Sequence, residues 1–539
     1  MHDRLAAPGP PRPSLDAFPL AQSEGLRVRW DRAAIRLSWL ALTVVLVLGV
    51  IAPVRRTGDA HQYLAMAHAL SKLRPPALTR AEVSDFKSWL IAQPLDSNFP
   101  SAERAIDQPP LVVAGRQEFS HFWFFPLLAS PFVAAARADG VHEAYGFFAL
   151  NALLLVVALR SLQRAFPPVV TLLIFASPLI WFVNKLQVEM FTFTAVCLAM
   201  SAARRGRFLL AGLFIAVAST QNLPIVAAVP VFWAAGLARW LLTRGEAATG
   251  AGDRPRYRNL LLTGALIAAT LIVGSLHPAY YQLRLGVLTP QQLNGGIAGG
   301  VPSISRYLAV LLDPDIGLLP WVPVLALLTL FGMVRLLAGR VNPSMSDRLD
   351  LRLTAACAVL TAAWFLFVFA ETSNVNSGGT VHVSRYALWL IPLLLPMLEE
   401  SAVWFQAKRP SLLPLGGALL FVAYAAYFRP WLPERYVTPS PQSEALNGWF
   451  PGVYRQVPEV FYERHRGIDG ATPDWAATAS CTVMLLSVGT QEPACPLSAS
   501  ERQTADGLFG KGWRTVWIVR PGRLGLGADG VTGAIRAGS

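Results

Sequence analysis

Long apolar segments recur along this chain and constrain its fold more than any other feature. Crossing the hydrocarbon core of a membrane takes roughly 20 mostly apolar residues in a helix, since every backbone amide must be paired internally there. The chain is 53% hydrophobic and 15% charged, with a mean hydropathy of +0.42, which excludes an ordinary soluble enzyme. We predict an all-α polytopic membrane protein with about eleven crossings. They are 37–54, 141–159, 167–183, 188–203, 207–220, 223–240, 258–276, 317–338, 353–370, 386–399 and 411–428.

The net charge of +13 comes largely from arginines between these segments, at 204–207, 239–258 and 335–352. Short loops rich in Lys and Arg are typical of the cytoplasmic side. We found no stripe of basic and aromatic residues on a soluble domain, which argues against nucleic-acid binding. We therefore expect several long loops on the opposite side, in the periplasm or its equivalent.

Three domains follow from this topology. Residues 1–36 are expected to form a disordered cytoplasmic tail, because they are rich in Pro and Arg. Residues 37–428 form the transmembrane domain, including a long external loop at 55–120. Residues 429–539 form a small extracytoplasmic domain. The segment 121–137 is interpreted as interfacial or re-entrant, because counting it as a crossing would place the arginines of 204–207 outside.

Two cysteines, Cys481 and Cys495, fall in the external tail. A disulfide between them requires an oxidising compartment, which agrees with an external position. Two unpaired thiols are the alternative, and the sequence leaves both open.

Asp59 stands where the chain leaves the first apolar segment, directly before a helical patch that begins at Ala60. One interpretation is an N-cap, which stabilises a helix by about 1 kcal/mol. The other is a general base at the edge of a partly dry site. The spacing alone does not choose between them.

Several segments resemble, in order, the GT-C superfamily of integral-membrane glycosyltransferases. "TGDAHQYLAMA" resembles the start of the first external loop in that superfamily, where an acid is followed by a Tyr and a helix. "QVEMFTFTAVCLAM", "LLDPDIGLLPWVPVLALL" and "NSGGTVHVSRYALWLIPLLLP" resemble later junctions between loops and spans. The resemblance covers roughly residues 37–428. It implies an inverting transferase that moves a sugar from a polyprenyl-phosphate donor to a glycan, lipid or protein acceptor. It also implies a location in the bacterial inner membrane, with the active site facing the periplasm.

The resemblance implies Asp59 as the catalytic base. Many members carry two adjacent acids at this position, whereas Ala60 follows Asp59 here. Glu189, at an external helix start, is the candidate for a second acid, because an ionisable residue at membrane depth is often functional. A snorkelling side chain at a helix start is the alternative.

Cations near the external face are candidates for binding the donor phosphate. They are Lys185, Arg385, Arg306 and Arg56. Each could also mark the headgroup plane without a function. Candidates for contacting the sugar or acceptor are His61, Tyr63, His382 and Tyr386. His61, His68 and His121, in or beside the first loop, could help to hold a sugar or a divalent ion, but such histidines are more often simply interfacial polar groups.

No HExxH or CxxC spacing occurs, so we expect no dedicated metal site, although a divalent cation is left open. The alternative function is a lipid or solute transporter of envelope biogenesis. Transporters usually show paired broken helices near the middle of the membrane. Here the ionisable residues gather at one face, which favours the transferase.

Overall fold

The computed structural model describes most of the chain between residues 17 and 449 and three strands beyond it. The described residues are 17–52, 54, 59–92, 111–243, 254–294, 304–339, 345–372, 383–428, 440–449, 460, 482–486, 515–519 and 531–536.

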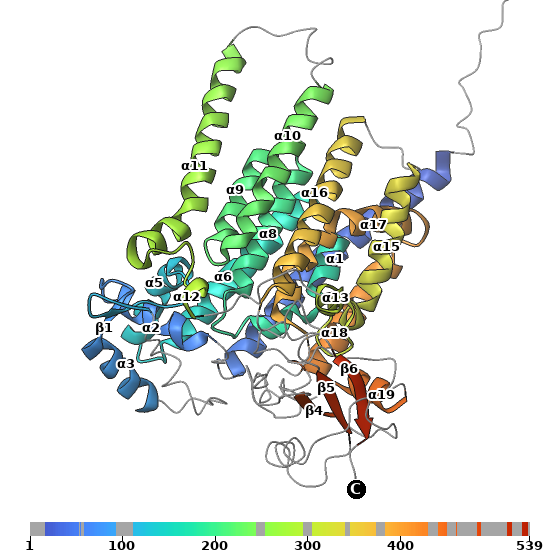
Figure 1. The fold of residues 1–539 in the computed structure, drawn as a ribbon. Helices are drawn as coiled ribbons and strands as arrows, with labels where there is room; N and C mark the ends of the chain where they lie inside the picture. Colours follow the sequence, from blue (N-terminus) through green and yellow to red (C-terminus); the bar gives the residue numbers. More distant parts are fainter. Residues whose placement is uncertain are drawn as a thin grey trace, which may run out of the picture.

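Helices dominate these residues, and most of them run side by side in one bundle (Figure 1). The α-helices are α1 (Ala17–Ile51), α2 (Ala60–Leu70), α3 (Arg80–Ala92), α5 (Phe124–Ala138), α6 (Ala144–Ala165), α7 (Pro168–Phe175), α8 (Glu189–Arg204), α9 (Phe208–Ser219), α10 (Val229–Thr243), α11 (Arg254–Leu285), α12 (Gln291–Asn294), α13 (Ile304–Leu312), α14 (Leu318–Trp321), α15 (Pro323–Ala338), α16 (Met345–Ala370), α17 (Leu395–Lys408), α18 (Leu412–Phe428) and α19 (Pro441–Trp449). The 3₁₀ helices are η2 (Pro178–Phe182), η3 (Leu223–Ala228), η5 (Arg385–Trp389) and η6 (Ile391–Leu394).

The helices show that this is an integral membrane protein. Six helical segments among the described residues are long and apolar enough to cross a membrane. They are Val28–Ile51, Ala144–Ala165, Leu223–Thr243, Leu260–Leu285, Asp347–Ala370 and Arg385–Lys408. Shorter apolar helices accompany them at Phe124–Ala138, Phe208–Ser219, Pro323–Ala338 and Leu412–Tyr427. The count of about eleven crossings stays a prediction.

Prolines explain why several expected spans are not single helices. The segment expected at 167–183 divides into α7 and η2, with Ser177 in an extended conformation between them. The residue before a proline disfavours the helical conformation, and Pro178 follows Ser177. The segment expected at 386–399 likewise begins as η5 and η6 before α17.

The expectation that residues 1–36 form a disordered tail is wrong over residues 17–36. These residues belong to α1, which is 35 residues long and continues without a break into the first apolar segment. A helix that is already nucleated can be extended at little cost, so an apolar span can continue into a polar sequence. Residues 1–16 lie outside the described part of the chain.

The fold is not wholly α-helical. Three short strands between α2 and α5, β1 (Leu78–Thr79), β2 (Val112–Val113) and β3 (Arg116–Gln117), form a sheet in the order β1-β3-β2. Ala114 and Gly115 both have positive φ angles, of 50° and 74°. A two-residue hairpin turn of this kind matches the twist of its strands. A second antiparallel sheet, β4 (Thr482–Leu486), β5 (Thr515–Val519) and β6 (Val531–Arg536), lies in the C-terminal region.

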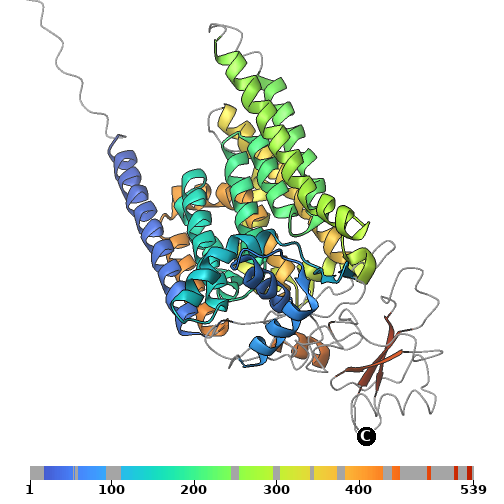
Figure 2. The ribbon, with the colours of Figure 1, turned by 90° about the vertical axis from the view of Figure 1, so that its left-hand side faces the viewer.

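The helices that follow α1 gather at one end of the bundle. Figure 1 shows α2, α3 and α5 together at the lower end, and α2 and α6 both pack on α5. Figure 2 shows α1 and α11 on opposite sides of the bundle. Of the elements described, α11 packs mainly on α9.

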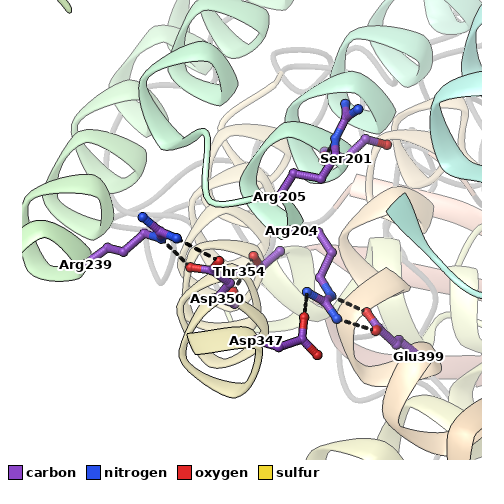
Figure 3. A network of polar contacts seen from close by, with 8 residues as sticks. All are labelled: Ser201, Arg204, Arg205, Arg239, Asp347, Asp350, Thr354 and Glu399. Carbon is purple, nitrogen blue, oxygen red and sulfur yellow. Dashed lines mark hydrogen bonds and ion pairs between the residues drawn. The ribbon is translucent and has the colours of Figure 1, made fainter. Parts of the chain in front are cut away.

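Ion pairs join the helices at the end where α8 finishes (Figure 3). Arg204, the last residue of α8, contacts both carboxylate oxygens of Glu399 on α17, at 2.7 and 2.8 Å. Arg204 also contacts Asp347 of α16 at 2.7 Å. Arg239 of α10 pairs with Asp350 of α16, at 2.5 and 3.2 Å. These arginines come from the segments that the charge pattern assigned to the cytoplasmic side.

Glycine permits one particularly close helix contact. A Cβ atom on Gly332 of α15 would collide with the backbone carbonyl of Met397 and lie 2.8 Å from the Ser401 hydroxyl, both on α17. Small residues at helix interfaces allow this approach in membrane proteins.

An apolar cavity of about 420 Å³ lies between α1, α7 and α18. Its wall includes Leu37, Val44 and Leu48 of α1, Leu172 of α7 and Phe421 of α18. Every residue that lines it is apolar.

Candidate functional site

Asp59 begins α2 without capping it through its side chain. The Asp59 carbonyl accepts hydrogen bonds from the backbone amides of Gln62 and Tyr63, at 3.0 and 3.3 Å. Its carboxylate makes no capping hydrogen bond. The N-cap interpretation of this side chain is therefore wrong, and the carboxylate is available for other contacts.

Those contacts are with an arginine and a histidine. Arg385 Nη2 lies 3.0 Å from Asp59 Oδ2, and His121 Nε2 lies 3.2 Å from the same oxygen. The side chains of Asp59, His121 and Arg385 are 27%, 18% and 11% exposed. The cluster is therefore recessed but still open to small groups on the side of Asp59 and His121.

Arg385 also links Asp59 to the second predicted acid. Its Nε lies 3.5 Å from Oε1 of Glu189, which is the first residue of α8 and only 1% exposed. The positive end of a helix dipole favours an anion at that position. The structure thus brings together Asp59, Glu189 and Arg385, three of the residues that the sequence nominated from segments far apart in the chain.

Neighbouring residues fix the position of Arg385. The amide of Ser384 donates to the carbonyl of Ile316, at 2.9 Å. The Arg385 guanidinium carbon lies 5.6 Å from the centre of the Tyr386 ring, which stacks on Phe369. These contacts hold the start of η5, so that Arg385 is already in place before a ligand binds.

Electrostatics keep Asp59 ionised. Burial by itself raises the pKa of a carboxyl group. The charges of His121 and Arg385, and their hydrogen bonds to the carboxylate, outweigh burial and hold the pKa of Asp59 well below its ordinary value.

The sequence nominates His121 for holding a sugar or a divalent ion, but it does not predict that His121 contacts Asp59. Its Nδ1 lies 3.1 Å from Gln62 Oε1, and its ring packs 4.9 Å from that of Tyr63. His121 is 62 positions beyond Asp59 and outside every motif that carries the resemblance, so spacing along the chain does not indicate that the two meet.

A second set of contacts anchors residues 118–120, the segment that leads to His121. Glu118 receives hydrogen bonds from Tyr280 and Arg284 of α11, at 2.7 and 2.6 Å. The Tyr281 hydroxyl donates to the Phe119 carbonyl at 2.9 Å, and Gln291 of α12 donates to the Ser120 carbonyl at 2.9 Å. The peripheral helix α11 therefore holds the segment that places His121 on Asp59.

The remaining predicted residues lie in different surroundings. Lys185 is 1% exposed, with its ammonium 5.6 Å from the centre of the Phe182 ring. Arg306 donates to the carbonyl of Ala370 at 3.0 Å and to that of Thr372, at the C-terminal end of α16. His61 and Tyr63 are buried on α2, and Tyr386 is on η5. Arg56 and His382 lie outside the described residues, as do Cys481 and Cys495.

The described residues offer no cluster of metal ligands. No group of three or more His, Cys, Asp or Glu side chains in that part of the chain could hold a metal ion.

Comparisons with known proteins found likenesses in structure alone. No family model and no curated protein matches the sequence. Two solved structures resemble the fold, both of ArnT from Cupriavidus metallidurans. One, bound to undecaprenyl phosphate, has a TM-score of 0.42 and 17% identity over 72% of this chain. The other, in the apo state, has a TM-score of 0.40 and 16% identity over 68% of this chain. The matched regions span 63% and 59% of those two chains.

Proposed function

We propose that this protein is a GT-C-type inverting glycosyltransferase that takes its sugar from a polyprenyl-phosphate donor. The observation that carries the proposal is the position of Arg385 between Asp59 and Glu189. A base and a phosphate-binding cation stand side by side at the end of a membrane bundle. The GT-C-like motifs contain all three of these residues.

Arg385 has donors to spare for an anion. Its Nη1 atom is buried and makes no hydrogen bond within the described part of the chain, and its buried Nε makes only the 3.5 Å ionic contact with Glu189. A guanidinium presents several donors in a fixed plane and binds phosphate in a two-pronged manner. A lipid phosphate could therefore replace protein contacts without a large rearrangement of the arginine.

The reaction requires one proton transfer and one displacement. An acceptor hydroxyl attacks the anomeric carbon and forms a new C–O bond, while the bond from that carbon to the phosphate oxygen breaks. Asp59 takes the hydroxyl proton, and the leaving lipid phosphate gains a negative charge that Arg385 stabilises. Attack opposite the leaving group inverts the anomeric centre. General-base catalysis of this kind typically contributes a hundredfold or more.

Other residues have secondary parts in this proposal. Lys185 and Arg306 would stabilise the negative charge of the donor phosphate from a distance. Tyr63 and Tyr386 would line the site. The hydrocarbon chain of the donor would lie in the apolar cavity along α1, since α1 ends at Ile51, shortly before Asp59. The acceptor would approach from the periplasmic side of a bacterial inner membrane, opposite the arginines of Figure 3.

The test is release of free lipid phosphate by purified protein supplied with undecaprenyl-phosphate hexoses and pentoses. Asp59→Asn should abolish release, because an amide cannot accept the proton. Asp85→Asn, at an exposed position on α3, is the matched control and should keep wild-type release. Equal release by Asp59→Asn and wild type would remove the assigned base. Movement of labelled lipid across proteoliposomes without any release would instead support the transporter.

A further inference from the structure

The surroundings of Gln62 determine which atoms in the site carry protons. The backbone amide of Ser120 lies 3.2 Å from Gln62 Oε1. A backbone N–H is always a donor, so the Gln62 atom that faces it must be the carbonyl oxygen. The Ser120 hydroxyl donates to the same oxygen, at 2.9 Å.

That assignment fixes His121. Its Nδ1 lies 3.1 Å from this carbonyl oxygen, which can only accept, so Nδ1 must carry a proton. Its Nε2 then faces Asp59 Oδ2 at 3.2 Å. Two lone pairs at this distance would repel each other. A proton must therefore lie between Nε2 and Oδ2, and the described geometry is that of a pair holding one shared proton.

We infer that His121 and Asp59 act as one proton-accepting pair, in which the acceptor's proton ends between Nε2 and Oδ2 and leaves through His121. This inference rests on the proposed function and adds a catalytic residue to it. The active form lacks the shared proton, with a neutral ring protonated on Nδ1 and an ionised carboxylate. The attacking hydroxyl gives its proton to Asp59, the C–O bond to the acceptor forms, and the lipid phosphate departs with the electron pair of the broken bond.

The pair explains a difficulty that Asp59 alone would face. A carboxylate held strongly in its ionised form by Arg385 is a weak base, whereas efficient bases titrate near the working pH. The imidazole gives the transferred proton a second place to go. His121 is also suited to release it, because its side chain is 18% exposed while that of Glu189 is 1% exposed.

Charged and titratable groups surround His121 on several elements. Asp59 and Tyr63 come from the start of α2, Arg385 from η5 and Glu189 from α8. His277 of α11 also lies within electrostatic range. The ring orientation itself is set by Gln62, which contacts His121 and Ser120 but not Asp59 through its side-chain oxygen, and is therefore a positioning residue.

The first experiment does not depend on turnover. In full-length protein labelled with ¹⁵N-histidine, His121→Asn identifies the signals of His121. We expect both ring nitrogens to be protonated at the acidic end of a pH series, and the neutral ring to keep its proton on Nδ1. A neutral ring that keeps its proton on Nε2 would contradict the inference, whether or not the protein is a transferase.

The second experiment uses the undecaprenyl-phosphate sugar that the wild type turns over. His121→Asn should lower kcat about a hundredfold. It should also move the acidic limb of the plot of kcat against pH to lower pH, because Asp59 would then be the only proton acceptor of the pair. A ring with a purely structural role would leave the limb where it is. His68→Asn on α2, whose ring contacts Glu143 and Lys72, is the matched control.

A third variant separates positioning from folding. Gln62→Met removes the acceptor for Nδ1 and should lower kcat, but it should add nothing to the loss in the His121→Asn background. Additive losses would overturn the role of Gln62. Absence of turnover by wild-type protein on every donor would refute the proposed function, and the ring-nitrogen experiment would still decide the state of the pair.

Discussion

Arg385 and Asp59 are 326 positions apart in the chain, yet their side chains meet at 3.0 Å. The same guanidinium reaches Glu189, so one arginine contacts carboxylates at the starts of two different helices. Removing a partner from a buried ion pair leaves an uncompensated charge, which typically costs about 3–5 kcal/mol. Binding and stability are therefore coupled at this residue.

Arg385→Gln should abolish turnover and lower the melting temperature, because the Glu189 carboxylate would stay buried without its counter-charge. Adding Glu189→Gln to this variant should restore most of the stability but none of the turnover. Thermal melting in detergent and lipid-phosphate release measure the two effects. Restored turnover in the double variant would show that Arg385 serves the fold alone.

Arg385→Lys should keep the charge and lose the two-pronged donor geometry. We expect a raised KM for the lipid donor together with a kcat lowered about tenfold, as for one lost charge-assisted hydrogen bond. Arg74→Lys, which alters an exposed ion pair with Glu82, is the control. A lysine variant with wild-type kinetics would argue against direct phosphate binding.

The low pKa of Asp59 makes a prediction about acid stability. A carboxyl with a folded-state pKa below its ordinary value, about 3.9, stabilises the fold fully above that value. The stabilisation is lost as the pH falls through the folded-state pKa. The difference in melting temperature between wild type and Asp59→Asn should therefore persist from neutral pH down to ~5 and shrink only below ~4. A difference that vanishes near neutral pH would contradict the assigned contacts.

Chelators should leave turnover unchanged, because Arg385 supplies the positive charge that a metal ion would otherwise provide to the leaving phosphate. The measurement is lipid-phosphate release after dialysis against EDTA, with and without added Mg²⁺ or Mn²⁺. Loss of activity that is restored by either ion would show that a cation takes part in the reaction.

Gly332→Ala should destabilise the bundle, because its new methyl group would collide with the Met397 carbonyl on α17. Forcing extra atoms into a packed interior typically costs about 1–3 kcal/mol. Gly416→Ala on α18 is the matched control, since a Cβ there meets nothing within 4 Å. Equal melting temperatures for the two variants would contradict the close contact of α15 and α17.

Much of the candidate site could be predicted because acids and cations are rare in apolar sequence. Asp59, Glu189 and Arg385 stand out at the ends of apolar segments, and they do meet. The pairing of His121 with Asp59 was missed, because it depends on a carbonyl oxygen of Gln62 and on a turn anchored by α11. Neither partner is visible from spacing along the chain.

The fold was predicted in class but not in detail. Apolar length indicates membrane helices, but it does not reveal that prolines such as Pro178 and Pro392 convert parts of them into 3₁₀ turns. The continuation of α1 through residues 17–36 was missed for the opposite reason, since a polar composition does not prevent a helix from continuing. The hairpin at Ala114 and Gly115 depends on two positive φ angles, which the pattern of apolar residues does not predict.

The helix α8 carries Glu189 at its first residue and Arg204 at its last, and both pair with one later segment, at Arg385 and Glu399. The two pairs have opposite polarity and stand about four helical turns apart. An inserted or deleted residue within α8 would rotate one end against the other by about 100°. The two pairs could then no longer form together. Substitutions along α8 can be accommodated locally. Its length is fixed, because Glu189 and Arg204 must both face their partners on the later segment.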